Sequence, residues 1–230
     1  MIISFSGFEN TIKLDACKPI VLEVQNRPLF ARVCQSLLTI DEDPKLEKYT
    51  IWDNDKVIKN QKAFIFITNP FSLPWTDRTL IGAITEKVGT FLVENNETRG
   101  KIEEYNRNII SSLEILALDL ESDYQIDHDW NTTAYLKAFG FGIEKDCEST
   151  LLDNLIKFLS YIYDCSVRKS VLFMNIKNFL SEKELENLYE HAIFLKIPLL
   201  LLENKSFNDV GKYEGRVIIE SDFTERTVNI

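Results

Sequence analysis

Four stretches of strand length in this chain are almost wholly apolar, and this feature limits the possible folds more than any other. They are AFIFIT (63–68), SVLFMN (170–175), LLLLE (199–203) and RVIIE (216–220). Strands that are apolar on both faces are typical of a parallel sheet covered by helices on each side. Helical patterns at 148–165 and 180–196 alternate with these stretches. The sequence therefore predicts an α/β fold with a mostly parallel sheet.

The beginning of the chain adds short strands and one helix to this sheet domain. Alternation of apolar and polar residues predicts strands at 1–6 and 11–15, and the segment 19–24 (PIVLEV) follows them. A helix is expected from about Pro28 to Ile40. Segment 45–58 is charged and turn-rich, with two strand-like pieces (YTIWD and KVI).

A long helical insertion separates the two parts of this α/β domain. Asp77 can cap its first helix, and the helical pattern continues to about Ser122. A break between two helices is expected at Asn95, Asn96 and Gly100. Two long antiparallel helices would form a projecting hairpin. The predicted organisation is a head domain made of residues 1–76 and 144–230, with an all-helical leg domain at 77–143.

Composition and charge exclude several classes of protein. The chain is 45% hydrophobic and 27% charged, which is typical of a globular protein. No apolar run reaches the roughly 20 residues that span a bilayer, so no membrane partner is expected. The first residues lack the pattern of an export signal, and a cytoplasmic protein with reduced thiols is expected. The four cysteines lack CxxC spacing and are Cys17, Cys34, Cys147 and Cys165.

The net charge of −10 comes mainly from one segment. Residues 111–153 hold ten acidic residues and two lysines, which gives −8, and the other 187 residues sum to about −2. Electrostatic fields are screened over about 10 Å at ordinary salt. The negative total therefore does not exclude nucleic acid binding at another part of the surface.

An α/β sheet suggests nucleotide binding, but the sequence lacks the usual phosphate-binding loop. None of the eight glycines forms GxxxxGK[ST] or GxGxxG, and the loop after 63–68 begins with Asn69 and Pro70. The two histidines, His128 and His191, form no recognisable catalytic or zinc-binding pattern. A catalytic role is therefore not expected. The alternative that stays open is a nucleotide- or phosphate-handling α/β enzyme with a helical lid, and a second alternative is an interaction protein that docks through its helices.

Five acidic residues within eleven positions form the most unusual local pattern. They are Asp119, Glu121, Asp123, Asp127 and Asp129. Carboxylates at this density repel one another unless they are solvated or neutralised, and Ca²⁺ binds six to eight such oxygen ligands. The pattern is not an EF-hand, because the sixth position is Tyr124 and the twelfth is Trp130. A calcium site and a solvated acidic loop are both compatible with it.

The helical insertion also carries basic residues mixed with acidic ones. They are Arg78, Lys87, Arg99, Lys101 and Arg107. Such a mixture usually forms a solvated helical surface. It becomes a DNA-binding surface if an oligomer gathers the basic residues around a channel.

The order of these elements resembles the Csn-two family, a CRISPR-associated adaptation protein of type II-A systems. The segments that carry the resemblance are LALDLESD (116–123), YLKAFGFGIE, STLLDNLIKFLSYIYDCSVRKSVLFMN and FLSEKELENLYEHAIFLKIPLLLLEN. The similarity covers most of the chain and is strongest from about residue 114 to 204.

The resemblance implies a non-catalytic protein that forms a homotetrameric ring. Its heads would resemble ATPase domains without the phosphate loop, and double-stranded DNA would be bound, preferably at ends, in a basic central hole. Calcium would be bound by acidic residues that correspond to Asp119, Glu121 and Asp123. The expected partners are duplex DNA, further copies of the chain, the CRISPR integrase and the effector nuclease. Family members usually have lysines around the hole, whereas here basic and acidic residues are interleaved.

Overall fold

A computed structural model describes residues 1–39, 46–143, 148–205 and 211–229. The chain divides into two compact units. One contains Met1–Pro74 and Lys145–Ile230 and is called the head below, and the other contains Trp75–Glu144 and is called the helical unit. In the described parts of the chain, no helix is long and apolar enough to cross a membrane.

The head is built around a six-stranded sheet with the order β10-β9-β3-β8-β7-β6. Its strands are β3 (Ile20–Val24), β6 (Phe64–Ile67), β7 (Ser170–Met174), β8 (Leu199–Glu203), β9 (Gly215–Ile219) and β10 (Glu225–Val228). All adjacent pairs are parallel except β9 with β10. The predicted α/β fold with a mostly parallel sheet is confirmed, and the antiparallel edge strand β10 was not predicted.

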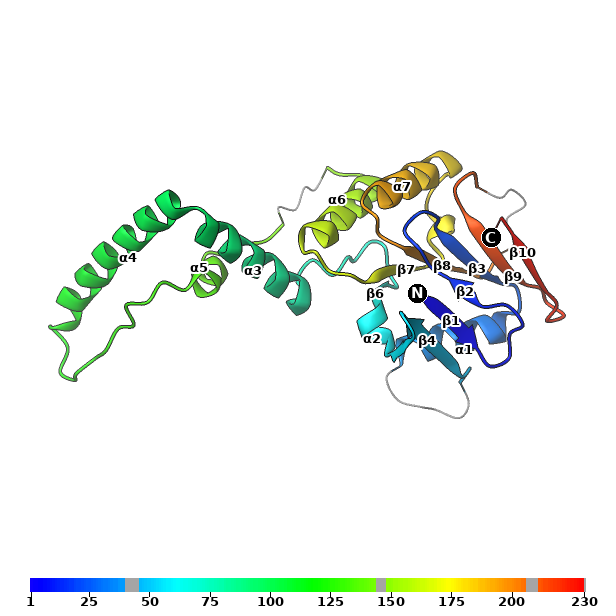
Figure 1. Cartoon of the computed structure of the whole chain (residues 1–230), viewed down its shortest axis with the longest axis horizontal. Coiled ribbons are helices and arrows are strands. Elements are labelled where there is room, and N and C mark those ends of the chain that lie inside the picture. Colours follow the sequence, from blue (N-terminus) through cyan, green and yellow to red (C-terminus); the bar gives the residue numbers. More distant parts are fainter. Residues whose placement is uncertain (40–45, 144–147, 206–210, 230) are drawn as a thin grey trace. The chain divides into compact units, whose positions relative to one another are not determined.

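Apolar layers cover both faces of this sheet (Figure 1). One face packs against α1 (Arg27–Leu38) and a four-stranded antiparallel sheet, in a core that includes Leu22, Val33 and Leu200. The other face is covered by α6 (Leu151–Asp164) and α7 (Glu182–Phe194), whose buried side chains include Phe158 and Leu188. Burial on both faces explains the continuous apolar runs in the sequence.

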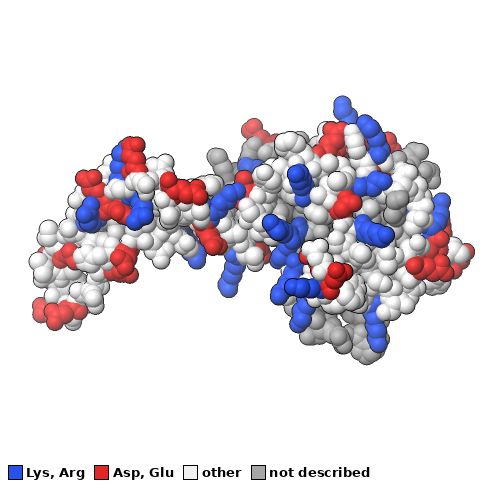
Figure 2. All heavy atoms as spheres, viewed as in Figure 1, with Lys and Arg blue, Asp and Glu red and all other residues white. Residues whose placement is uncertain are grey.

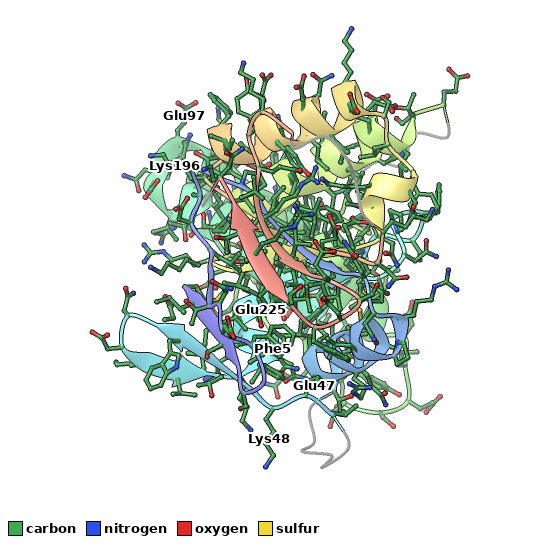
Figure 3. All side chains as sticks on the ribbon, turned by 90° about the vertical axis from the view of Figure 1, so that its right-hand side faces the viewer. Phe5, Glu47, Lys48, Glu97, Lys196 and Glu225 are labelled. Atoms are coloured by element: carbon green, nitrogen blue, oxygen red, sulfur yellow. The ribbon has the colours of Figure 1, made fainter. Side chains whose placement is uncertain are left out.

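The four-stranded sheet has the order β2-β1-β4-β5 and is formed by the beginning of the chain. Its strands are β1 (Ile2–Phe5), β2 (Ile12–Lys13), β4 (Tyr49–Asp53) and β5 (Lys56–Ile58). A short helix, α2 (Asn60–Ala63), leads from β5 into β6. Glu225 of β10 joins this part to the large sheet, because its carboxylate accepts hydrogen bonds from the backbone N–H groups of Glu9 (2.8 Å) and Asn10 (2.9 Å) (Figure 3).

Both helices on the second face begin with a capping box. Ser181 and Glu184 form the one that the sequence predicts at the start of α7. Thr150 and Asp153 form a second box at the start of α6. The 3₁₀ turn η1 (Ile176–Asn178) follows β7.

The helical unit contains α3 (Arg78–Glu94), α4 (Asn96–Ala117) and α5 (Thr132–Ala138). Asp77 caps α3 as expected. The expected antiparallel hairpin is wrong: Asn95 is the only residue between α3 and α4, and the two helices diverge from it (Figure 1). One residue is too short a loop to reverse the chain, and α5 packs against α3 instead. Gly100, expected at the break, lies inside α4.

Candidate functional site

The start of α1 occupies the place where a phosphate-binding loop would follow the first strand of a nucleotide-binding sheet. Helix α1 follows β3 after only Gln25 and Asn26. The Asn26 side chain accepts a hydrogen bond from the Leu29 N–H (3.0 Å), and Pro28 has no N–H to offer. An anion at this helix start would meet few free donors, because phosphate sites depend on unpaired backbone N–H groups.

A buried polar cluster lies on the α6–α7 face of the large sheet. Its members are Glu23, Lys177, Tyr189, Glu203, Glu214 and Arg216, and all are at most 8% exposed. Glu214 is the centre of the cluster. It accepts hydrogen bonds from Lys177 Nζ (2.7 Å), the Tyr189 hydroxyl (2.8 Å) and Arg216 Nε (2.6 Å).

The charges of this cluster depend on one another. Burial alone would raise the pKa of Glu214, but the charges of Lys177 and Arg216 and the hydrogen bonds from Lys177 and Tyr189 lower the pKa below its ordinary value. Burial lowers the pKa of Lys177, and Glu214 partly offsets that effect. Burial, and then Glu214, raises the pKa of Tyr189 well above its usual range. The cluster ties η1, α7 and β9 together.

The predicted DNA-binding residues of the helical unit are not gathered on one surface of a single chain. Arg99 pairs with Glu103 (Nε–Oε1 2.7 Å), and Lys101 pairs with Glu97 (Nζ–Oε1 2.5 Å). At about 100° per residue, Arg99 and Lys101 also point roughly 160° apart around α4.

The other three predicted contacts lie on the same two helices. Lys87 Nζ lies over the Phe91 ring at 5.9 Å from its centroid. Arg78 is the first residue of α3, and Arg107 is an exposed residue of α4. A combined basic surface from these five residues would require more than one copy of the chain. The prediction of DNA contacts here stays a prediction.

The five acidic residues of the predicted calcium site are exposed and lie in the segment after α4. This segment runs back along α4: Asn106 Nδ2 donates a hydrogen bond to the His128 carbonyl oxygen (3.0 Å), and His128 Nε2 lies 3.0 Å from the Glu114 carboxylate. Asp127 accepts a hydrogen bond from the Asp129 N–H (3.0 Å).

These acidic side chains do not form a ready-made metal site within the described parts of the chain. No three carboxylate, histidine or cysteine side chains there are close enough together to hold an ion. The oxygen chemistry suits Ca²⁺, but the positions of Asp119, Glu121, Asp123, Asp127 and Asp129 do not. Calcium binding at this stretch stays a prediction, and it requires the segment to change shape or to receive ligands from another chain.

An apolar groove of about 480 Å³ lies between α3, α4 and α5. Its lining includes Leu92, Ile102, Tyr105, Ile109 and Tyr135. Apolar side chains continue along the exposed surface of the helical unit and include Leu113 (47% exposed), Leu116 (64%) and Leu118 (82%). The sequence predicts the apolar stripe of α4, but the groove depends on α5, which was missed. The Asn131 cap before α5 and the aromatic residues around it were the available signals.

Comparison with known proteins gives two matches. A family model described as "CRISPR-associated protein (Cas_Csn2)" matches residues 41–223. Among solved structures, the chain is similar to the crystal structure of Stu0660 of Streptococcus thermophilus. The TM-score is 0.60 at 15% sequence identity, over 96% of this chain and 75% of that one. None of the curated proteins compared with the chain matches it.

Proposed function

Because the chain belongs to the CRISPR-associated Csn2 family, we propose that it is a non-catalytic protein that binds double-stranded DNA as a homotetrameric ring and acts in spacer acquisition. The observation that carries this proposal is the exposed apolar surface of the helical unit. A single chain that exposes contiguous apolar side chains on this scale is typical of a protein that associates with a partner.

Self-association explains this surface more fully than a solvated helical lid would. Tyr105, Ile109, Leu113 and Leu116 follow one another at helical spacings along α4 and are each about half exposed or more. Full burial of such a side chain contributes about 1.5–3 kcal/mol, so burial of the exposed half of each contributes about half of that. Closed rotational symmetry is the usual arrangement of identical subunits, so a ring is the expected product.

The head supports a binding role in preference to catalysis. The start of α1 presents Pro28 and a self-capped turn where a nucleotide-binding protein presents free backbone donors. The runner-up, a nucleotide- or phosphate-handling enzyme with a helical lid, would need those donors. A thermal-shift measurement with ATP provides the direct comparison, and a clear rise in melting temperature would favour the enzyme.

DNA binding by the ring would be independent of sequence. Lysine and arginine side chains that contact phosphates fix the position of a duplex without reading its bases. Four copies of Arg78, Lys87 and Arg107 would line one hole, whereas Arg99 and Lys101 are partly neutralised by their glutamate partners. Calcium at the acidic stretch would reduce repulsion between carboxylates and act on assembly. The integrase and effector nuclease of the same system are the proposed protein partners.

The proposal is tested by a gel-shift comparison of linear duplex with covalently closed circles of equal length. A duplex can enter a closed ring through its end, so linear DNA should bind more tightly than the circle. Equal affinity for both forms would contradict the ring. The absence of DNA binding, together with partner-protein binding that does not depend on salt, would instead favour an interaction protein.

A further inference from the structure

The topology of the head brings the starts of three parallel strands to one edge of the large sheet. Phe64 at the start of β6 pairs with Ser170 of β7, and Val171 pairs with Leu199 at the start of β8. Adjacent strands are about 4.8 Å apart, so the three starts lie within roughly 10 Å. We call this the amino edge of the sheet.

A basic residue precedes each of these strand starts. The amino-edge patch consists of Lys59, Lys62, Arg168, Lys169 and Lys196. Figure 2 shows lysine and arginine side chains gathered over the part of the head that holds α2 and the start of β7. These residues are far apart in sequence, so the patch is a product of the fold and cannot be recognised from any one segment.

Well-defined turns position the basic residues that precede two of the three strands, β7 and β8. Helix α6 ends in a turn in which Ser166 (φ 54°) donates its N–H to the Tyr163 carbonyl oxygen at 2.9 Å. Helix α7 ends in the same manner, and Lys196 (φ 57°) donates its N–H to the Ile193 carbonyl oxygen at 3.0 Å. A left-handed residue closes each helix and directs the chain into the next strand.

The charges of the patch are not neutralised by acidic side chains within the described parts of the chain. None of its five residues forms an ion pair there, and all are exposed except Lys169, which is half-buried. By contrast, Arg32, Arg99, Lys101 and Arg226 are paired with glutamates. Five positive charges at one edge of a chain whose net charge is −10 need an explanation.

Exposed aromatic rings stand at the same ends of the two helices. Tyr163 in the last turn of α6 is 55% exposed, and Phe194, the last residue of α7, is 80% exposed. Basic residues interleaved with exposed aromatic rings are typical of nucleic acid surfaces, and bases stack on the rings where the strand is single. On a duplex, whose bases are already stacked, the rings would contact sugars beside the phosphates that the cations contact. This combination favours DNA over an acidic protein.

We propose that the amino-edge patch is the surface through which the head contacts the phosphate backbone of duplex DNA. The inference rests on the proposed function and adds a contact surface outside the helical unit. With five phosphate contacts per chain, the head would contribute more to DNA affinity than the basic residues of α3 and α4, two of which are paired with glutamates.

The test compares three variants with equal loss of charge, by fluorescence anisotropy with a 30-base-pair duplex across a salt series. The patch variant is K59Q/K62Q/R168Q/K169Q/K196Q. The head control is K13Q/R27Q/K48Q/K183Q/K205Q, and the helical-unit variant is R78Q/K87Q/R99Q/K101Q/R107Q. We expect the patch variant to lose about 100-fold or more in affinity. The slope of log K against log salt should fall by about 4.5 for each chain that contacts the duplex, since each of the five contacts contributes about 0.9.

Each other outcome has a defined meaning. If the patch variant and the head control lose the same affinity for DNA, only net charge matters. That result would overturn the inference about the patch but not the proposal that the protein binds DNA. Loss confined to the helical-unit variant would overturn the inference too. A wild-type protein that does not bind DNA contradicts the proposed function itself.

If polyglutamate competes with the duplex at the patch as well as heparin does, the surface is for an acidic protein. If the patch variant has a lower melting temperature but an unchanged affinity for DNA, the basic residues of the patch only stabilise the carboxyl ends of α6 and α7.

Discussion

Glu23 of β3 and Glu203 of β8 are register partners on adjacent parallel strands, and both side chains are fully buried. The Oε2 atom of each has no hydrogen-bond partner among the described residues. Burial raises the pKa of Glu203 to about 7, and the hydrogen bond from the Lys177 N–H offsets only part of that rise. The Glu203 carboxyl is therefore partly protonated near neutral pH, whereas Glu23 Oε2 lies 3.8 Å from Arg216 Nη1.

The first prediction concerns Glu203→Gln and the dependence of stability on pH. The folded-state pKa lies above the ordinary value of 4.5, so the folded state binds more protons and loses stability as pH rises from about 4.5 to about 7. The total change is roughly 3 kcal/mol at 1.36 kcal/mol per pKa unit. The glutamine stays neutral and can still accept the Lys177 N–H. We expect the variant to match the wild type in urea unfolding at pH 5 and to be more stable at pH 8.

The difference in unfolding free energy between the variant and the wild type reports the titration of Glu203 alone. Burial lowers the pKa of His191, which favours the folded state as pH rises, but this effect is present in both proteins. A stability difference that is the same at pH 5 and pH 8 would contradict the assignment.

The second prediction concerns Glu214→Gln, which removes the central charge of the buried cluster. Lys177 and Arg216 would each keep a buried charge without its main partner, and breaking such a pair costs about 3–5 kcal/mol. The matched control is Glu220→Gln, because Glu220 pairs with Arg226 at the surface (2.8 Å), where a pair contributes about 0–1 kcal/mol. Urea unfolding at pH 7 measures both variants, and equal effects would show that the cluster does not support the fold.

The sheet was predictable because its strands differ from everything around them. Residues 199–203 are apolar at four successive positions, which only a strand buried on both faces requires. The capping box at Ser181 was equally local. The hairpin of α3 and α4 was not predictable in the same way, because the path of the chain after Asn95 depends on α5 packing against α3. Strand β10, with exposed residues at its centre, carries little apolar signal.

The functional surfaces were harder to predict than the fold. The five basic residues that were predicted to bind DNA belong to one continuous segment. Two of them, Arg99 and Lys101, are paired with glutamates one helical turn away. The amino-edge patch joins Lys62, Arg168 and Lys196, which only the strand order brings together. The buried cluster was missed because Glu23 and Glu214 look like surface residues until the register of β3, β8 and β9 is known.

The third prediction concerns calcium and the acidic stretch. Calcium should raise the melting temperature of the wild type by mass action, and D119N/E121Q/D123N should abolish the rise. Mg²⁺ should have little effect, because it demands a tighter octahedral geometry. The variant D53N/D55N/E104Q removes the same charge elsewhere and should keep the calcium response. If chelator leaves the wild-type melting temperature unchanged, these acidic residues are simply solvated.

The last prediction concerns the exposed apolar stripe of α4. Leu113→Glu with Leu116→Glu would place two charges where the proposed ring buries two leucines, which are 47% and 64% exposed in the single chain. Full burial of a leucine contributes about 1.5–3 kcal/mol, and burial of the exposed half contributes about half of that, so association at each interface should weaken by about 10-fold or more. Light scattering at several concentrations in calcium should show a tetramer for the wild type and smaller species for the variant. Helical content should not change, because both leucines already face solvent.

A matched variant on another side of the same helix separates the loss of apolar contacts from the addition of charge. Asn108→Glu with Ser111→Glu adds two charges at exposed polar positions of α4, and it should remain a tetramer. Dissociation of both variants would indicate that repulsion between helical units, which already carry excess negative charge, decides the assembly. If the wild type has the mass of one chain at every concentration, both in calcium and in chelator, the proposed ring is wrong. The apolar stripe would then bind a different partner.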